Sequence, residues 1–162
     1  DGNLIKGSKR PVQTIDYGFV GDIADNSIDS TQLQNILESG LTPVFSAIIH
    51  DGKGQLLNTN ADTIASAIAV AMCNLYKTKL VYCFEKKGVL RNVSDENSVI
   101  PEINAQNYST LKNSGAINSG MIPKMDNAFK AISKGVTSVL IGDSKQVSEL
   151  NSAGNFGTQL IA

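Results

Sequence analysis

Amide and carboxylate side chains are concentrated in segment 57–63, Leu-Asn-Thr-Asn-Ala-Asp-Thr, between a strand-like segment and a helical pattern. Asn60 is a suitable N-cap for that helix, and Asp62 falls in its first turn, where the helix dipole favours a negative charge. Capping alone explains both residues. A ligand site is the second interpretation, because open α/β sheets bind ligands where strand ends meet helix starts. The segment therefore predicts an ordinary helix start or a polar binding site.

A second polar segment, 114–124, is a glycine-bearing loop that leads into a helix with Pro123 in its first turn. Backbone N–H groups at such a helix start, with Lys124 beside them, could bind a phosphate group. Taken alone, Lys124 is more simply explained as a solvated surface charge. The chain contains no G-x-x-x-x-G-K-[ST] sequence, which excludes a phosphate loop of the Walker type.

Segment 83–90, Cys-Phe-Glu-Lys-Lys-Gly-Val-Leu, is a strand end followed by charges and a glycine turn. A nucleotide base could lie against Phe84 there, although a plain transition from strand to loop explains the same residues. His50 is the single histidine, and no spacing pairs it with a serine, cysteine or aspartate in a catalytic arrangement. We therefore interpret His50 as the polar end of a strand, since catalysis requires a demonstrated geometry.

Strand-like and helix-like periodicities alternate along the chain, which predicts an α/β fold with a largely parallel sheet sandwiched by helices. The expected strands are 43–49, 79–84, 137–141 and 157–161, with a short segment 55–58 after a tight turn at 51–54. A first helix is expected from a capping box of Thr31 and Gln34 to Gly40, and a second from Ala61 to about Tyr76. A weaker helix is expected around Tyr108 and stops at Gly115. Two more are expected, one with Met125 and Ile132 on its buried face that ends at Gly135, and one around Val147 and Leu150. No internal repeat divides the chain, so a single compact domain over residues 1–162 is expected.

The composition is that of an ordinary globular protein, with 41% hydrophobic and 18% charged residues among 162. Fourteen basic and fifteen acidic residues give a net charge of -1, which excludes a broad basic surface for nucleic acid or an anionic membrane. No window approaches the roughly 18 consecutive apolar residues of a membrane span. Cys73 and Cys83 lie in apolar stretches without metal or disulfide spacing, so two buried thiols in a reducing cytoplasm are expected.

Five segments together resemble the amino acid kinase family, and within it the enzymes that phosphorylate N-acetylglutamate in arginine biosynthesis. They are Asp-Tyr-Gly-Phe-Val-Gly-Asp at 16–22, Asn-Thr-Asn-Ala-Asp at 58–62, Gly-Val-Leu at 88–90, Gly-x-Ile-x-x-Gly-Met-Ile-Pro-Lys at 115–124, and Gly157-Thr158. Their order and spacing match over essentially the whole chain. The second and fourth segments are the most specific for the family. Each alone is a weak signal, and the two at the right spacing are a strong one.

The resemblance implies an amino acid kinase, or carbamate kinase-like, fold, with ATP as the phosphoryl donor and Mg²⁺ held mainly through its phosphates. It places Asn58 and Asn60 on the substrate. It gives Asp62 the role of orienting catalytic lysines, and places Lys124 on the transferring phosphoryl group. The residues that it assigns to the nucleotide are Cys83, Phe84, Glu85, Gly88, Ile117, Gly120, Met121 and Lys124. Glu85 stands where the family commonly has aspartate, a departure at the position expected to make a ribose or backbone contact.

Family members open with a lysine-containing strand, a Gly-Gly loop and a substrate-binding arginine, none of which this chain contains. The resemblance therefore implies the C-terminal ATP-binding domain of a kinase whose N-terminal third, the substrate lobe, is absent. It also implies a cytoplasmic protein with small-molecule partners that is a homodimer at full length. The alternatives are a kinase for UMP, aspartate or glutamate, and a catalytically silent nucleotide-binding module. The amides of Asn58 and Asn60 favour an acylglutamate.

Overall fold

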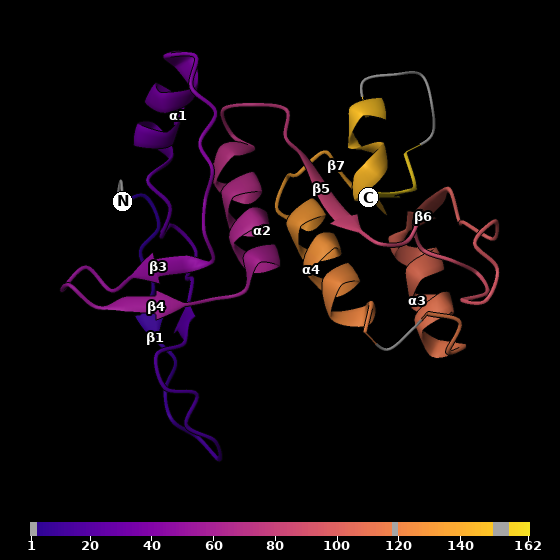
Figure 1. Ribbon diagram of the computed structural model, residues 1–162, viewed down its shortest axis with the longest axis horizontal. Coiled ribbons are helices and arrows are strands. Elements are labelled where there is room, and N and C mark those ends of the chain that lie inside the picture. The colour runs from indigo at the N-terminus through magenta and orange to yellow at the C-terminus, as the bar shows by residue number, and fades with distance from the viewer. Residues whose placement is uncertain (1–2, 118–119, 151–155) are drawn as a thin grey trace. The chain divides into compact units, whose positions relative to one another are not determined.

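The computed structural model describes residues 3–117, 120–150 and 156–162. By its internal contacts the chain divides into two compact units, Asp1–Met72 and Cys73–Ala162, where the sequence predicted one domain. Figure 1 shows the first unit in indigo to magenta and the second through orange to yellow. Among the described residues, none of the helices has both the length and the apolar character needed to cross a membrane.

The first unit contains two antiparallel strand pairs. Its strands are β1 (Ser8–Lys9), β2 (Gly21–Asp22), β3 (Ile48–His50) and β4 (Leu56–Asn58). β1 pairs with β2 and β3 with β4. The predicted turn at 51–54 joins β3 to β4, and a carboxylate oxygen of Asp51 accepts the N–H groups of Lys53 (2.7 Å) and Gln55 (3.1 Å). The turn prediction is therefore confirmed.

The predicted strand 43–49 is wrong over most of its length. Only Ile48 and Ile49 of that run belong to β3, and residues 41–46 have no regular structure. Val44 is 93% exposed, whereas Phe45 packs against the core of the unit. A short apolar run predicts burial on average, but it does not distinguish a strand from a coil that buries single side chains.

Two helices complete the first unit, α1 (Ser30–Glu38) and α2 (Ala61–Met72). The predicted capping box of Thr31 and Gln34 is wrong, because α1 begins at Ser30 and its N-cap is Asp29, two residues before Thr31. A carboxylate oxygen of Asp29 accepts the N–H of Gln32 at 2.9 Å. Gly40 follows the end of α1 with a φ of 81°, a conformation that favours glycine and agrees with the predicted helix end.

The start of α2 agrees with its prediction, and its end does not. The side-chain oxygen of Asn60 accepts the N–H of Asp62 at 2.7 Å, which confirms Asn60 as a cap. The helix ends at Met72, before the predicted Tyr76. Its Ile64 and Met72 are buried in the core of the unit. The buried residues of that core are Leu4, Ile5, Leu33, Ile49, Leu57, Ile64 and Met72.

The second unit is built on a four-stranded sheet. Its strands are β5 (Lys79–Phe84), β6 (Glu102–Asn104), β7 (Ser138–Asp143) and β8 (Thr158–Ile161), in the order β5-β7-β8-β6. β5 pairs with β7 in parallel, as β6 does with β8, whereas β7 and β8 are antiparallel. The sheet is therefore largely parallel, as the periodicity predicts. β6 was not expected from the sequence.

Helices pack against this sheet. They are α3 (Ala105–Asn113), α4 (Ile122–Ser133) and the 3₁₀ helix η1 (Ser144–Glu149). α4 contacts β7 and β8, α3 contacts β6, and η1 contacts β5 and β7. Met125 and Ala128 on the predicted face of α4 are fully buried. The predicted helix around Val147 and Leu150 is a 3₁₀ helix rather than an α-helix.

Substitution of Asp29 with alanine should lower the free energy of unfolding by about 1 kcal/mol, because the first turn of α1 loses its capping oxygen. Thr31→Ala is the matched control, since Thr31 is exposed inside the helix, and it should change stability by less than about 0.5 kcal/mol. Urea denaturation of both variants measures the two values. A larger loss at Thr31 than at Asp29 would contradict the observed cap.

Candidate functional site

The parallel strands β5 and β7 end at the same edge of the sheet. Phe84, the last residue of β5, lies opposite Asp143, the last residue of β7. The loop that begins at Glu85 leaves one strand and η1 begins directly after the other. In α/β sheets ligands bind in the crevice outside the carboxyl ends of such strands. The strand register thus places two loops where a small-molecule site is expected.

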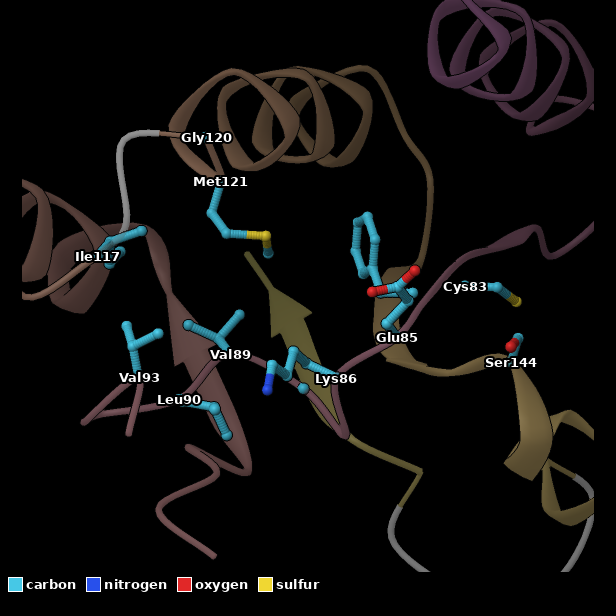
Figure 2. Close-up of a pocket in the computed structure, with 12 residues that line it drawn as sticks. Cys83, Glu85, Lys86, Val89, Leu90, Val93, Ile117, Gly120, Met121 and Ser144 are labelled. Atoms are coloured by element: carbon cyan, nitrogen blue, oxygen red, sulfur yellow. The ribbon is translucent and has the colours of Figure 1, made fainter. Parts of the chain in front are cut away.

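A cavity of about 680 Å³ lies at this edge. Its volume is within the roughly 300–1,000 Å³ of small-molecule sites. Figure 2 shows Val89, Val93 and Ile117 on one side of it, with Cys83 and Ser144 on the other. The lining residues are Cys83, Phe84, Glu85, Lys86, Gly88, Val89, Leu90, Val93, Ile117, Gly120, Met121 and Ser144. Apolar side chains with a few charged groups at the margin suit a flat, partly aromatic ligand that carries a charge.

The structure gathers most of the residues that the resemblance assigns to a nucleotide. Those that line the cavity are Cys83, Phe84, Glu85, Gly88, Ile117, Gly120 and Met121. Lys124 does not line the cavity, but its Nζ lies 4.8 Å from the centre of the Phe84 ring, which does. Of the predicted phosphate loop 114–124, residues 118–119 lie outside the described residues. Nucleotide binding itself stays a prediction.

Lys86 belongs to segment 83–88, which the resemblance places along the nucleotide, but the rest of the lining was missed: Val89, Leu90, Val93 and Ser144. A signal existed for the first two, because they follow Gly88 directly in the resembling segment 88–90. Ser144 follows β7 directly, so the rule that parallel strands end together could have found it. Val93 had no signal, since it stands in a polar stretch.

The buried hydroxyl of Thr158 fixes the loop that forms one wall of the cavity. It accepts the N–H of Val89 at 2.8 Å and donates to the carbonyl oxygen of Ile100 at 2.7 Å. A Cβ atom on Gly88 would lie 2.8 Å from the same hydroxyl oxygen, which explains why this position is glycine. Gly157 has a φ of 55°, and a Cβ there would overlap the carbonyl oxygen of Ile141. The Gly157-Thr158 pair thus supports the cavity from β8.

The segment after this wall folds back on itself as a short hairpin. Leu90 and Val99 form an antiparallel bridge, and the N–H of Ile100 donates to the carbonyl of Val89 at 2.8 Å. Lys86 forms an ion pair with Glu96 at 3.1 Å, with both side chains more than half exposed. Such an exposed pair contributes little stability. The hairpin position therefore depends mainly on its backbone pairing.

The cationic group of Lys124 lies against an aromatic face at the margin of the cavity. An ammonium within about 6 Å of a ring centre is attracted by the negative face of the ring. Phe84 can hold the Lys124 side chain in this way while the rest of that ring contacts the cavity. Lys124 therefore has a defined position beside the cavity, which the interpretation as a solvated charge does not require.

The two cysteines are less buried than predicted. Cys83 is exposed and Cys73 is half-buried. The side chains of β5 alternate in exposure, and the phase of that alternation turns Cys83 outward. The thiol of Cys73 donates to the carbonyl oxygen of Lys134 at 3.3 Å. An apolar neighbourhood in the sequence therefore did not predict burial at either position.

The predicted substrate residues belong to the first unit. Asn58 ends β4, has an exposed side chain, and donates its N–H to the carbonyl of Phe19 at 2.8 Å. Asn60 and Asp62 form the start of α2. The cavity belongs to the second unit, so a site shared by these residues and the cavity stays a prediction.

Comparison with known proteins shows the family to which the chain belongs. The model of the amino acid kinase family matches residues 5–143. The chain belongs to the amino acid kinase family. An acetylglutamate kinase from Cytophaga hutchinsonii is 50% identical to this chain, and the alignment covers 100% of this chain and 61% of the Cytophaga protein. One from Bacteroides fragilis is 50% identical over 87% of this chain and 53% of its own. The chain thus spans less than two thirds of these relatives.

Solved structures show the same fold. An N-acetylglutamate synthase from Neisseria gonorrhoeae, complexed with coenzyme A and N-acetyl-glutamate, superimposes with a TM-score of 0.84 at 21% identity, over 99% of this chain and 37% of its own. A carbamate kinase from Giardia lamblia bound to AMP-PNP superimposes with a TM-score of 0.60 at 15% identity, and the match covers 88% of this chain and 52% of the Giardia chain. The predicted α/β amino acid kinase fold, carbamate kinase-like, is confirmed.

In this amino acid kinase chain, Thr158→Val should lower the free energy of unfolding by about 2 kcal/mol, because a buried N–H and a buried carbonyl lose their partner. Thr137→Val is the control, since Thr137 is exposed on the neighbouring chain segment, and it should change stability by less than about 0.5 kcal/mol. Chemical denaturation measures both. Equal effects of the two substitutions would show that the Thr158 hydrogen bonds contribute nothing.

Proposed function

We propose that the chain is the nucleotide-binding part of a kinase that transfers the γ-phosphoryl group of ATP to the γ-carboxylate of an N-acyl-L-glutamate, with N-acetylglutamate as the first candidate. The cavity carries the proposal, because the residues that the family resemblance assigns to the nucleotide converge on it from separate segments. The relatives named acetylglutamate kinase support the choice of substrate at 50% identity. The resemblance places the reaction in arginine biosynthesis.

The base and ribose of ATP would occupy the apolar part of the cavity. Val89, Ile117 and Met121 offer the nonpolar contacts that a flat ring needs. The phosphates would extend toward Lys124, whose ammonium lies beside Phe84 at the margin. Glu85, an exposed carboxylate among the lining residues, is suited to accept hydrogen bonds from ribose hydroxyl groups.

The reaction needs charge neutralisation more than covalent help from the protein. A γ-carboxylate oxygen attacks the γ-phosphorus in line, the bond from that phosphorus to the bridging oxygen breaks, and ADP leaves with the electron pair. A carboxylate is already ionised near neutral pH, so no general base is required. Lys124 would offset the repulsion between the two anions, a kind of contribution worth about 3 kcal/mol.

The first unit would supply groups for the acceptor. Asn58 and Asn60 would hydrogen-bond the acylated glutamate with their amides, as the resemblance implies. Asp62 would hold catalytic lysine groups in one geometry from its place in the first turn of α2, where the helix dipole favours a negative charge. These roles require the complete kinase.

Mg²⁺ would be carried on the phosphates of ATP. Among the described residues no three or more His, Cys, Asp and Glu side chains gather as a metal site. Mg²⁺ commonly keeps several waters and binds through substrate phosphates. When bound, it supplies charge neutralisation at the transferring phosphoryl group.

The resemblance also supports proposals about the setting of the protein. We infer a cytoplasmic enzyme that uses small molecules only, consistent with a net charge of -1 and no broad basic surface. We further infer a homodimer at full length. Size-exclusion chromatography with light scattering on the full-length protein measures the subunit number, and a monomer would contradict that inference.

Substrate competition in the full-length protein tests the proposed function. N-acetylglutamate should be phosphorylated in preference to UMP, aspartate and free glutamate, with ADP release measured by a coupled assay. The 162-residue chain alone should bind Mg-ADP weakly and turn over little ATP, because it lacks the glycine-containing lobe. Preference for UMP or aspartate would contradict the substrate, and binding without turnover at full length would favour a silent nucleotide-binding module.

Lys124→Ala in the full-length protein should lower kcat by about 100-fold, because the transferring phosphoryl group loses a cation. Its effect on the free energy of unfolding should stay below about 0.5 kcal/mol. Lys130→Ala is the matched control, since Lys130 is an exposed lysine further along the same helix. It should leave both quantities unchanged. An unaltered kcat in the Lys124 variant would return that residue to the role of a surface charge.

A further inference from the structure

Helices α3 and α4 are joined by an aromatic pair. The rings of Tyr108 on α3 and Phe129 on α4 stack with centres 4.9 Å apart and planes 19° from parallel. Tyr108 is only 7% exposed. Stacked aromatic rings contribute beyond their buried area and define the distance between the elements that carry them. The pair therefore fixes the separation of the two helices.

A polar network extends from this ring to the first turns of α4. The hydroxyl of Tyr108 donates to a carboxylate oxygen of Asp126 at 2.7 Å and lies 3.3 Å from the carbonyl oxygen of Ile122. Lys112 contacts both oxygens of the same carboxylate, at 2.8 and 2.9 Å. We call Tyr108, Lys112, Asp126 and Phe129 the α3–α4 cluster.

Contacts within the cluster shift the pKa values of Asp126 and Tyr108. Hydrogen bonds from Lys112 first and then from Tyr108 hold the pKa of Asp126 below its usual value. Burial, followed by the hydrogen bond to Asp126, raises the pKa of Tyr108. Both shifts favour an ionised Asp126 and a protonated Tyr108 near neutral pH. The Lys112–Asp126 pair is partly exposed and would contribute little alone, but the buried ring below it restricts both partners.

The first turn of α4 is contacted from outside the helix by the Tyr108 hydroxyl. Met121 occupies the cap position and makes no side-chain cap hydrogen bond. Met121 also lines the cavity, and Lys124 lies in the same first turn. Asp126 comes two residues after Lys124, and Ile122 two residues before it. The α3–α4 cluster therefore contacts α4 two residues before Lys124 and two residues after it in the sequence.

We propose that the α3–α4 cluster positions the first turn of α4 so that Lys124 reaches the phosphates of a nucleotide bound in the cavity. Tyr108, Lys112 and Asp126 are then positioning residues that touch neither base nor phosphate. The proposal rests on the proposed nucleotide site and adds residues that act on the phosphate end of the ligand. It makes a selective claim: contacts to the phosphates depend on the cluster, and contacts to the nucleoside do not.

Comparison of ADP with adenosine separates these two ends of the ligand. In the full-length protein, displacement of a fluorescent ADP analogue gives the Kd of each for Asp126→Asn, Lys112→Met and Tyr108→Phe. The affinity for Mg-ADP should fall by about fivefold in each variant, toward that of Lys124→Ala. The affinity for adenosine should change by less than about twofold. Lys112→Arg keeps a cation that can contact both oxygens, and should retain most of the ADP affinity.

Asp29→Ala serves as the control for stability, because its cap lies in the first unit and its loss should leave both affinities unchanged. Tyr108→Phe keeps the stacked ring, so it tests the hydroxyl without removing the buried group. Equal ADP affinity in the variants and the unsubstituted protein would overturn the proposal, as would an equal fall for ADP and adenosine. If the unsubstituted protein binds neither ligand, the proposed function fails, and this proposal with it.

Discussion

Parallel pairing runs from Lys79 opposite Ser138 to Phe84 opposite Asp143, and it makes β5 and β7 end at one edge of the sheet. The cavity depends on this register, because its walls are the loop after β5 and the start of η1 after β7. A slip by one residue would turn every side chain of a strand to the opposite face. The buried Val139 and Ile141 of β7 oppose such a slip, since they would lose their place in the core.

Contacts distant in sequence then give the cavity its shape. The Thr158 hydroxyl on β8 reaches the loop 88–90 across 69 residues of chain, and the α3–α4 cluster joins Lys112 to Asp126 beside the lysine-bearing turn. The first contact joins a buried hydroxyl to a backbone N–H group, and the second joins an ammonium to a carboxylate beside the stacked rings. The proposed phosphoryl transfer would depend on positions and charges more than on reactive side chains, so supporting contacts of this kind would matter to it.

The sequence predicted elements best where pattern and burial agree. The strand 79–84 was predicted with its bounds, since apolar residues and a following glycine turn mark it clearly. β6 was missed because only Ile103 is buried, between an exposed Glu102 and a half-buried Asn104. The strand 43–49 was overestimated, as Val44 points to solvent. The family resemblance named most of the residues that line the cavity. Ser144 could have been found from the rule that parallel strands end together, whereas Val93 required the folded chain.

The central claim is that a nucleotide binds at the carboxyl ends of β5 and β7. Titration of the ¹⁵N-labelled full-length protein with Mg-ADP, followed by amide chemical shifts, tests it most directly. The account predicts that the largest shifts fall on Phe84, Gly88 and Ile117, with the amides of the β3–β4 turn at 51–54 unmoved. Saturable shifts that leave those three amides unchanged, or no shifts at any concentration, would contradict it.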